Sequence, residues 1–319
     1  MNRSGSDPRI VFVAANPSID RFIAVDEITP GTIHRPEFVL AVPGGKGLNA
    51  ARAAFSLGGD VTAVGIVGGR AGEWISDRLA GLGLSATLVG DVSGHETRAC
   101  LSVLDRSTGR LTEFYEAGEG IGPNVWPMLE EAIDGELGRG IAGAIVCSGS
   151  LPVGAPTDGY ARIVRMAQKR SIRTVVDCHG PALLATLEAR PSVVKVNAIE
   201  AAEATGASSQ DPLGAARALI ALGATTAIVT IGSDGAIAHD AGSAWRLVMP
   251  GPPGLYPVGS GDAFIAGLAL AMVRGASFVE AARFGVAAGT ANAQVPGAGL
   301  LEADRIPELL QAVEVRSAL

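Results

Sequence analysis

Short runs of consecutive apolar residues recur along the chain, and longer segments rich in alanine and leucine separate them. The apolar runs cover 10–14, 61–67, 144–147, 174–177, 193–196 and 227–231. Because these runs are continuous rather than alternating, they predict strands that are buried on both faces. The segments 47–57, 72–82, 158–169 and 211–222 carry apolar residues at helical spacing. The alternation predicts an α/β fold with a doubly wound, mostly parallel sheet flanked by helices.

Two segments, 20–42 and 96–116, break this alternation, because each reads as strands joined by turns with no helix between them. In the second segment, Ser107, Thr108 and Gly109 are typical of a hairpin turn. We therefore expect a small β-lid inserted into a single domain that spans 1–319. A lid sheet with an open apolar face would tend to pair with its own copy, which predicts a homodimer through the lid.

Composition narrows the class of protein. The chain has 319 residues, 48% of them apolar, and a formal net charge of −7. The apolar content excludes a disordered or fibrous chain, and the acidic balance argues against nucleic-acid or anionic-membrane partners. The longest strongly apolar stretch, 263–273, is shorter than the roughly 18 residues of a membrane span. Three widely separated cysteines predict neither disulfides nor a zinc site, and favour a cytoplasmic location.

The strongest chemical signal is the sequence PVGSGDAF at 257–264, which leads into an alanine- and leucine-rich helix. Gly259, Ser260 and Gly261 can bring backbone N–H groups together at the helix N-terminus, where an anion is favoured. Asp262 then stands beside that anion site. It is suited to take a proton from a hydroxyl group while the N–H groups hold a transferring phosphoryl group. The alternative is an ordinary tight turn with Asp262 as the N-cap.

A second glycine-rich segment, PGGKGLNAAR at 43–52, also precedes an alanine-rich helix. Its Gly44, Gly45, Lys46 and Asn49 could hold sugar hydroxyls or a phosphate through backbone, ammonium and amide donors. The alternative is a plain helix start with a solvated lysine. The spacing is not that of a P-loop, so this segment alone does not indicate nucleotide binding.

Two further segments follow strands. In KVNAIE at 195–200, Asn197 and Glu200 could present oxygen atoms to hydrated Mg²⁺, or could form a capping box. In TIGSDG at 230–235, the glycines could let a triphosphate approach the backbone, or could form only a hairpin turn.

Together these four segments resemble, in order and separation, the signatures of the PfkB (ribokinase-like) carbohydrate kinases, from about residue 9 to residue 310. The resemblance implies ATP as phosphoryl donor, with Asp262 as general base and Gly259, Ser260 and Gly261 steadying the γ-phosphoryl charge. It implies that Lys195, Asn197, Thr230, Gly232 and Gly235 line the triphosphate side and that Glu200 lies near Mg²⁺. Whether K⁺ activates the protein stays open.

Three shorter elements are similar to the 1-phosphofructokinase and tagatose-6-phosphate kinase branch: NPSID at 16–20, ETR at 96–98 and SGSLP at 148–152. That branch implies a phosphorylated ketohexose, namely fructose 1-phosphate, tagatose 6-phosphate or fructose 6-phosphate. By this resemblance Asp20 and Asn49 would hold sugar hydroxyls, and Gly44 and Gly45 would line the sugar pocket. Arg98, with Lys46 and Arg35 as further candidates, would meet the existing phosphate, a task that suits the planar guanidinium fork.

Two other functions remain open at this stage. The chain could be a kinase of the same fold for an unphosphorylated sugar or a nucleoside. It could also be a catalytically silent regulator that binds a nucleotide or a sugar phosphate, although an intact Asp262 with its glycines argues against this.

Overall fold

The structure is a computed structural model that describes residues 7–90 and 94–318. Its main sheet has ten strands in the order β14-β13-β12-β11-β10-β9-β8-β1-β4-β5. The parallel part contains β1 (Arg9–Ala14), β4 (Val61–Val67), β5 (Ser85–Gly90), β8 (Ala142–Ser148), β9 (Arg173–Asp177), β10 (Val193–Asn197) and β11 (Thr226–Thr230). An antiparallel edge follows, formed by β12 (Ala236–His239), β13 (Ala244–Val248) and β14 (Glu314–Ser317).

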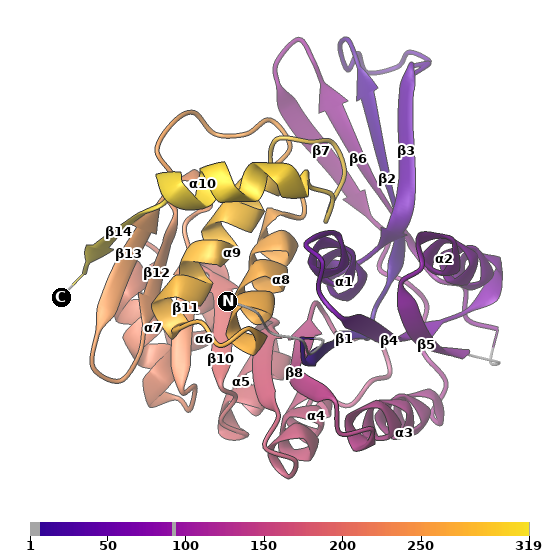
Figure 1. Ribbon diagram of the computed structural model, residues 1–319. Helices are drawn as coiled ribbons and strands as arrows, with labels where there is room; N and C mark the ends of the chain where they lie inside the picture. Colours follow the sequence, from indigo (N-terminus) through magenta and orange to yellow (C-terminus); the bar gives the residue numbers. More distant parts are fainter. Residues whose placement is uncertain (1–6, 91–93, 319) are drawn as a thin grey trace.

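Helices cover both faces of this sheet (Figure 1). One layer contains α1 (Lys46–Ser56), α2 (Gly69–Leu82), α8 (Ser260–Val273), α9 (Phe278–Asn292) and α10 (Ile306–Ala312). The other contains α3 (Val125–Gly138), α4 (Gly159–Gln168), α5 (Gly180–Glu188), α6 (Ala198–Thr205) and α7 (Pro212–Ala221). In β1, Ile10 and Phe12 pack into the first layer while Val11 and Val13 pack into the second. Burial on both faces therefore explains the continuous apolar runs and confirms the expected doubly wound fold.

A separate four-stranded sheet stands above the body in the order β3-β2-β6-β7 (Figure 1). Its strands are β2 (Ser18–Val25), β3 (Phe38–Gly44), β6 (Ala99–Asp105) and β7 (Arg110–Tyr115). The two expected lid segments thus form one sheet, in which β2 and β6 pair in parallel. The turn between β6 and β7 contains Ser107, Thr108 and Gly109, as the sequence predicts. We call this sheet the lid.

The antiparallel edge and several helices were absent from the expected elements. The edge strands are short, and their exposed charged residues, such as Arg246 and Glu314, give no apolar run to detect. Helix α9 is rich in alanine and glycine because it packs very closely on α8. A Cβ at Gly285 would come within 2.8 Å of the Phe264 ring. Small residues at these positions reflect close contact with the neighbouring helix. They do not produce the apolar stripe by which a helix is predicted from a sequence.

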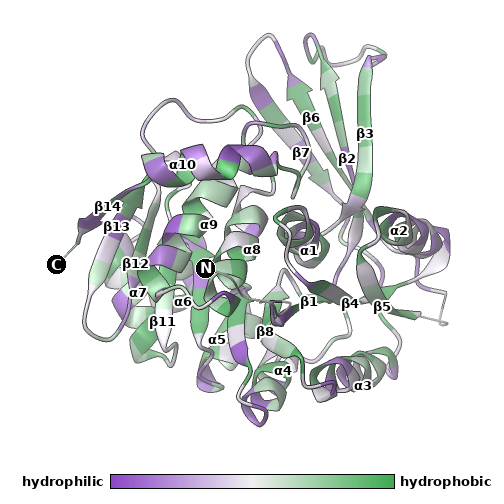
Figure 2. Cartoon of the chain, viewed as in Figure 1, coloured by the Kyte–Doolittle hydropathy of each residue, from purple (hydrophilic) through white to green (hydrophobic). Residues whose placement is uncertain are grey.

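Hydrophobic residues extend from the central strands into α8, whose sides are nearly all apolar (Figure 2). Within the described residues, however, we find no helix that combines the length and the apolar character required for a membrane span.

Candidate active site

The candidate site forms where the carboxyl ends of β9 and β10 meet the N-terminal ends of α1, α6 and α8, a usual place for ligands in open α/β sheets. Asp177 is the last residue of β9 and is completely buried. The Lys46 ammonium donates to its Oδ1 at 2.9 Å, and the Lys195 ammonium donates to its Oδ2 at 2.6 Å. A single buried carboxylate therefore holds two lysine side chains in place.

The charges of this cluster stabilise each other. Burial would raise the pKa of Asp177, but Lys195 and Lys46 outweigh it and lower that pKa to about 2. Burial would lower the pKa of Lys46, yet the carboxylates of Asp177, Glu200 and Asp262 raise it above its usual value. Asp177 and Lys46 are therefore both charged near neutral pH.

Asp177 is the functional candidate that sequence reasoning missed. It directly ends a predicted strand, and an acidic residue at the carboxyl end of a buried parallel strand is a signal that could have identified it.

The loop before α8 has the conformation that its glycines predict. Gly259 adopts a left-handed φ of 83° and is the N-cap of α8. A Cβ there would lie 2.5 Å from the Ala298 Cα, so no larger residue fits. The cap makes no side-chain hydrogen bond, and Asp262 lies in the first turn of the helix, so Asp262 is not the N-cap. The Ser260 hydroxyl is buried without a hydrogen-bond partner among the described residues, as a donor waiting for an anion would be.

Asp262 is buried next to this loop and contacts the second glycine-rich segment. The Asn49 Nδ2 donates to Asp262 Oδ2 at 3.0 Å and to Asp20 Oδ2 at 3.1 Å. Burial raises the pKa of Asp262 to about 7, although Lys46 and Lys195 favour its charged form. A carboxyl group with a pKa near neutrality, facing a second polar group in a cleft, is typical of a general base.

Asp20 lies on β2 at the base of the lid. Its Oδ1 accepts from the Ser18 hydroxyl at 2.5 Å, and its Oδ2 also accepts from the Gly45 N–H at 3.3 Å. A Cβ at Gly44 would stand 2.0 Å from the Asp20 Cγ. Gly44 is thus required by the position of this carboxylate, and the glycine-rich turn at 43–47 brings Asp20 and Asn49 together.

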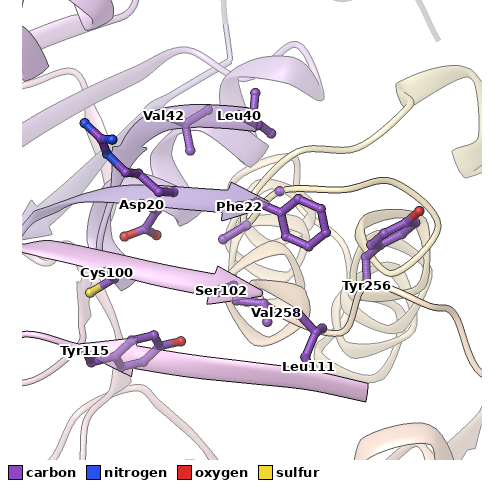
Figure 3. A pocket seen from close by; sticks show the side chains of 13 residues that line it. Asp20, Phe22, Leu40, Val42, Cys100, Ser102, Leu111, Tyr115, Tyr256 and Val258 are labelled. Atoms are coloured by element: carbon purple, nitrogen blue, oxygen red, sulfur yellow. The ribbon is translucent and has the colours of Figure 1, made fainter. Parts of the chain in front are cut away.

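A small cavity of about 20 Å³ separates the inner face of the lid from the loop before α8 (Figure 3). Asp20 and Cys100 lie at one end of the cavity, and Phe22 faces Tyr256 at the other. The two aromatic rings meet edge to face with centroids 5.7 Å apart. A space of this size holds about one water molecule. The lid therefore lies close against the body in this structure.

The three cations expected at the substrate's phosphate have separate partners here. Arg98 donates from Nη1 to the Glu116 carbonyl at 3.1 Å and from Nη2 to the Asn16 carbonyl at 3.3 Å. Lys46 is paired with Asp177 and lies 3.4 Å from Glu200 Oε1. Arg35 is exposed in the loop between β2 and β3. Their common phosphate role stays a prediction.

On the side expected for the triphosphate, Asn197 and Glu200 form a capping box at the start of α6. Asn197 Oδ1 accepts from the Glu200 N–H at 2.9 Å, and Glu200 Oε2 accepts from the Asn197 N–H at 2.9 Å. The Thr230 hydroxyl donates to the Val196 carbonyl at 3.4 Å.

The glycines that follow Thr230 belong to a hairpin between β11 and β12. A Cβ at Gly235 would lie 1.9 Å from the Leu247 carbonyl, whereas one at Gly232 would meet open space. Gly235 is therefore explained by packing, and only Gly232 leaves room beside the backbone. The Lys195 ammonium lies close to the first turn of α8, since a Cβ at Gly261 would be 2.9 Å from its Nζ.

The residues suit a magnesium ion that arrives with a nucleotide. Among the described residues no group of three or more His, Cys, Asp and Glu side chains could hold a metal ion. Mg²⁺ normally keeps water and phosphate ligands and needs only one or two protein carboxylates. Glu200 can supply one of these, because only its Oε2 is committed to the capping box.

Comparisons with known proteins identify the family of this chain. The model of the pfkB family carbohydrate kinases matches residues 10–304. The tetrameric inhibited form of phosphofructokinase-2 from Escherichia coli is 30% identical, with 95% of this chain and 98% of that chain covered and a TM-score of 0.84. The complex of that enzyme with fructose-6-phosphate gives 28% identity, coverage of 96% and 99%, and a TM-score of 0.82. It has also been solved with potassium.

The fold is shared more widely. A possible 1-phosphofructokinase from Thermotoga maritima is 23% identical, with 98% of this chain and 100% of that chain covered, and superposes with a TM-score of 0.87. Since the family model spans nearly the whole chain and includes both glycine-rich segments, the chain belongs to the PfkB carbohydrate kinase family, whose members are phosphotransferases with an alcohol group as acceptor.

Proposed function

We propose that the protein transfers the γ-phosphoryl group of ATP to a hydroxyl of a phosphorylated ketohexose: fructose 1-phosphate, tagatose 6-phosphate or fructose 6-phosphate. The observation that carries this proposal is Asp262, a buried carboxyl with a pKa raised to about 7 by burial, beside a glycine-built helix N-terminus. Asp262 takes the proton of the acceptor hydroxyl, and the N–H groups of Gly259, Ser260 and Gly261 stabilise the charge on the transferring group.

The sugar would bind between the lid and the body. Asp20 and Asn49 hold its hydroxyls, because the Asn49 amide donates to Asp262 at 3.0 Å and to Asp20 at 3.1 Å and so brings both carboxyl groups to one corner. Gly44 and Gly45 line this corner, and Gly44 allows the Asp20 carboxylate to lie against the backbone there. The lid excludes water, which is the competing acceptor for the phosphoryl group.

The triphosphate would lie along Lys195, Asn197, Thr230, Gly232 and Gly235, with Lys46 facing the same space from α1. Bound Mg²⁺ would neutralise charge on the phosphate oxygens, and Glu200 is the carboxylate that would hold it. Because Asp177 fixes both ammonium groups, little reorganisation is needed when the phosphates arrive. A potassium effect is open, and replacement of KCl by NaCl in the assay tests it.

The existing phosphate of the substrate distinguishes this proposal from a kinase for neutral sugars. Arg98 lies at the base of the lid, and its Nε is buried without a partner among the described residues. We assign the phosphate to Arg98, with Arg35 approaching from the lid loop. The fructose-6-phosphate complex of the E. coli relative supports a substrate of this class.

ADP release with a panel of acceptors tests the function: fructose 1-phosphate, fructose 6-phosphate, tagatose 6-phosphate and neutral sugars or nucleosides. We expect a sugar phosphate to give the highest kcat/KM, and Arg98→Ala to reduce it about 10- to 100-fold while hardly changing turnover of any neutral sugar. Arg106→Ala, at the exposed tip of the lid, is the matched control. Turnover of only neutral acceptors would favour the alternative kinase, and no ADP release with any acceptor would favour a silent regulator.

We also propose that two copies of the protein form a dimer through the outer face of the lid. We place this dimer in the cytoplasm, and we take residues 1–319 as a single kinase unit. Residues 1–6, 91–93 and 319 of that unit lie outside the described residues. The outer face exposes apolar side chains on both edge strands of the lid, with Val39 of β3 58% and Phe114 of β7 60% exposed. Sedimentation of the protein and of Phe114→Glu tests the dimer, which the charged variant should dissociate. A monomeric wild type would contradict it.

A further inference from the structure

Arg52 is a buried arginine that the proposed reaction does not use. It lies on α1, two turns from Lys46, and is only 3% exposed. Its Nη2 donates to Asn49 Oδ1 at 2.7 Å and to the Ala298 carbonyl at 2.6 Å. Its Nε and Nη1 are buried without a hydrogen-bond partner among the described residues. A buried guanidinium with two nitrogen atoms that lack partners is unfavourable by itself, so its position calls for an explanation.

The bond to Asn49 fixes the orientation of an amide that serves both carboxylates of the site. An asparagine side chain has one acceptor end and one donor end. Because Arg52 can only donate, it must face the carbonyl oxygen of Asn49. The amide nitrogen is therefore directed at Asp262 and Asp20, to which it donates at 3.0 and 3.1 Å. Rotation of the amide by half a turn would break all three hydrogen bonds.

The second bond of Arg52 reaches the loop that supports the catalytic turn. Ala298 lies against Gly259, where a Cβ would come within 2.5 Å of the Ala298 Cα. The next residue, Gly299, donates its N–H to Asn292 Oδ1 at 3.0 Å. One guanidinium thus connects the amide beside Asp262 to the loop packed on the N-terminus of α8.

We propose that Arg52 is a positioning residue for the phosphoryl-transfer reaction: it orients Asn49 toward Asp20 and Asp262 and holds the 297–299 loop against Gly259. This inference rests on the proposed function, in which Asp262 is the base. It names a residue that touches neither substrate and acts through Asn49 and the loop.

The positive charge of Arg52 also supports Asp262, because it favours the ionised form of that carboxyl group. Burial lowers the pKa of Arg52 to about 10, while Asp20 and Asp262 oppose the shift, so the guanidinium is still charged at neutral pH. Asp262 is also faced by Lys46 of α1, Lys195 of β10, Asp177 of β9 and, through Asn49, Asp20 of β2. Loss of the Arg52 cation from this set makes the Asp262 carboxylate less favourable and raises its pKa.

The first test is the pH profile of kcat/KM for the best sugar phosphate. In Arg52→Met we expect kcat to fall about 10- to 100-fold and the acid limb to move to higher pH. Arg52→Lys keeps the positive charge but loses the planar guanidinium group that donates to both Asn49 and Ala298. We therefore expect a several-fold loss of kcat, with the acid limb of the pH profile at the same pH as in the wild type. The matched control is Arg173→Met, which also removes an arginine bonded to a backbone carbonyl, at 2.6 Å, but far from Asp262. It should change neither quantity.

The second test needs no activity and applies even if no acceptor is found. Asp262 has a raised pKa, so its ionisation destabilises the folded chain at pH 8, and Asp262→Asn relieves this. If Arg52 supports the carboxylate, Asp262→Asn should raise the unfolding temperature at pH 8 more in the Arg52→Met background than in the wild type. The difference should vanish at pH 5, where Asp262 is protonated in both.

Three results would overturn the inference. One is an Arg52→Met variant that loses thermal stability but keeps the kcat and the acid limb of the wild type. Another is full additivity of Arg52→Met and Asn49→Ala in kcat, because residues that act in series are not additive. The third, decisive if Arg52→Met fails to fold, is an Arg52→Lys variant with an unchanged kcat. If the wild type is inactive with every acceptor, the proposed function fails, while the pH 8 comparison still decides whether Arg52 supports Asp262.

Discussion

The floor of the site and the lid above it are built in opposite ways. The floor is ionic: Asp177, at the end of β9, has no exposed surface and pairs with Lys195 of β10 and Lys46 of α1, and the buried Asp262 of α8 lies nearby. The lid holds only a small apolar cluster, in which Phe22, Ala24 and Leu104 are buried. Its strand β7 is almost entirely exposed. Buried ion pairs therefore hold the floor together, whereas a small apolar cluster holds the lid.

This difference follows from the two tasks of a phosphoryl-transfer site. Groups that stabilise charge in the transition state must be in place beforehand, which requires a packed framework. A cover that admits substrate and then excludes water must open, which requires contacts of low stability. We therefore expect changes in the floor to affect chemistry and folding, and changes in the lid to affect binding and the leak of phosphoryl groups to water.

The largest expected effect is that of Asp262→Asn. The side chain keeps its size, and α8 is capped by Gly259, so folding should be preserved. Turnover should fall about 10²- to 10⁴-fold, the usual contribution of a general base, while the dissociation constant of the sugar phosphate stays constant or improves. The measurement is ADP release together with equilibrium binding. A loss of less than about tenfold would mean that Asp262 is not the general base. The floor would then not supply the group that takes the proton.

The same residue gives a pH dependence with a definite sign. Burial raises the pKa of Asp262 to about 7 from the ordinary 3.8, so the wild type loses the base as pH falls through 7, and kcat/KM should fall with it. Between pH 4 and 7 the folded chain binds more protons at this site than the unfolded chain, so stability declines as pH rises. Asp262→Asn should therefore have the higher unfolding temperature at pH 8, and the difference should disappear near pH 4.

The next effect concerns folding of the floor. Asp177→Asn leaves two ammonium groups without their carboxylate, and removal of one partner from a buried ion pair typically destabilises by about 3–5 kcal/mol. The pKa of Asp177 is lowered to about 2, so the difference should be complete above pH 4 and shrink as pH falls toward 2. Chemical denaturation at several pH values measures it. Asp60→Asn, which breaks a partly exposed pair with Arg9, is the control and should lose only about 1 kcal/mol.

A smaller effect is expected in the lid. Phe22→Ala removes the edge-to-face contacts with Tyr256 and Phe38, whose ring centroids lie 5.7 and 6.0 Å away. The lid should then dock less firmly. We expect KM for the sugar phosphate to rise about tenfold and ADP release without acceptor to increase, with kcat nearly unchanged. Phe55→Ala, at the end of α1, is the control. A large loss of kcat with an unchanged KM would mean that the lid shapes the chemistry as the floor does.

The two regions also differ in how far the sequence predicts them. The floor's fold was predictable because each strand that is buried on both faces is a continuous apolar run, and because Gly259 to Asp262 needs glycines at fixed positions. The lid was predictable as strands, but not its pairing, since the parallel contact of β2 and β6 joins segments about eighty residues apart. Asp177 could have been singled out as a site residue because it ends a predicted strand, but its pairing with two lysines could not be predicted, and neither could the role of Arg52, because both depend on partners from other elements.

The smallest expected effect is at Glu200, which lies at the border of the floor. The structure shows its capping box with Asn197, and its second carboxylate oxygen lies 3.4 Å from Lys46. Glu200→Gln keeps the capping hydrogen bond through the amide oxygen but removes the charge. If that charge holds Mg²⁺ near the triphosphate, the Mg²⁺ concentration for half-maximal activity should rise several-fold, while binding of the sugar phosphate stays nearly intact. An exposed acidic residue of the same helix, Glu203, provides the control as Glu203→Gln. An unchanged Mg²⁺ dependence with a modest loss of thermal stability would leave Glu200 with the capping role alone, and the metal would then be held by the nucleotide and water.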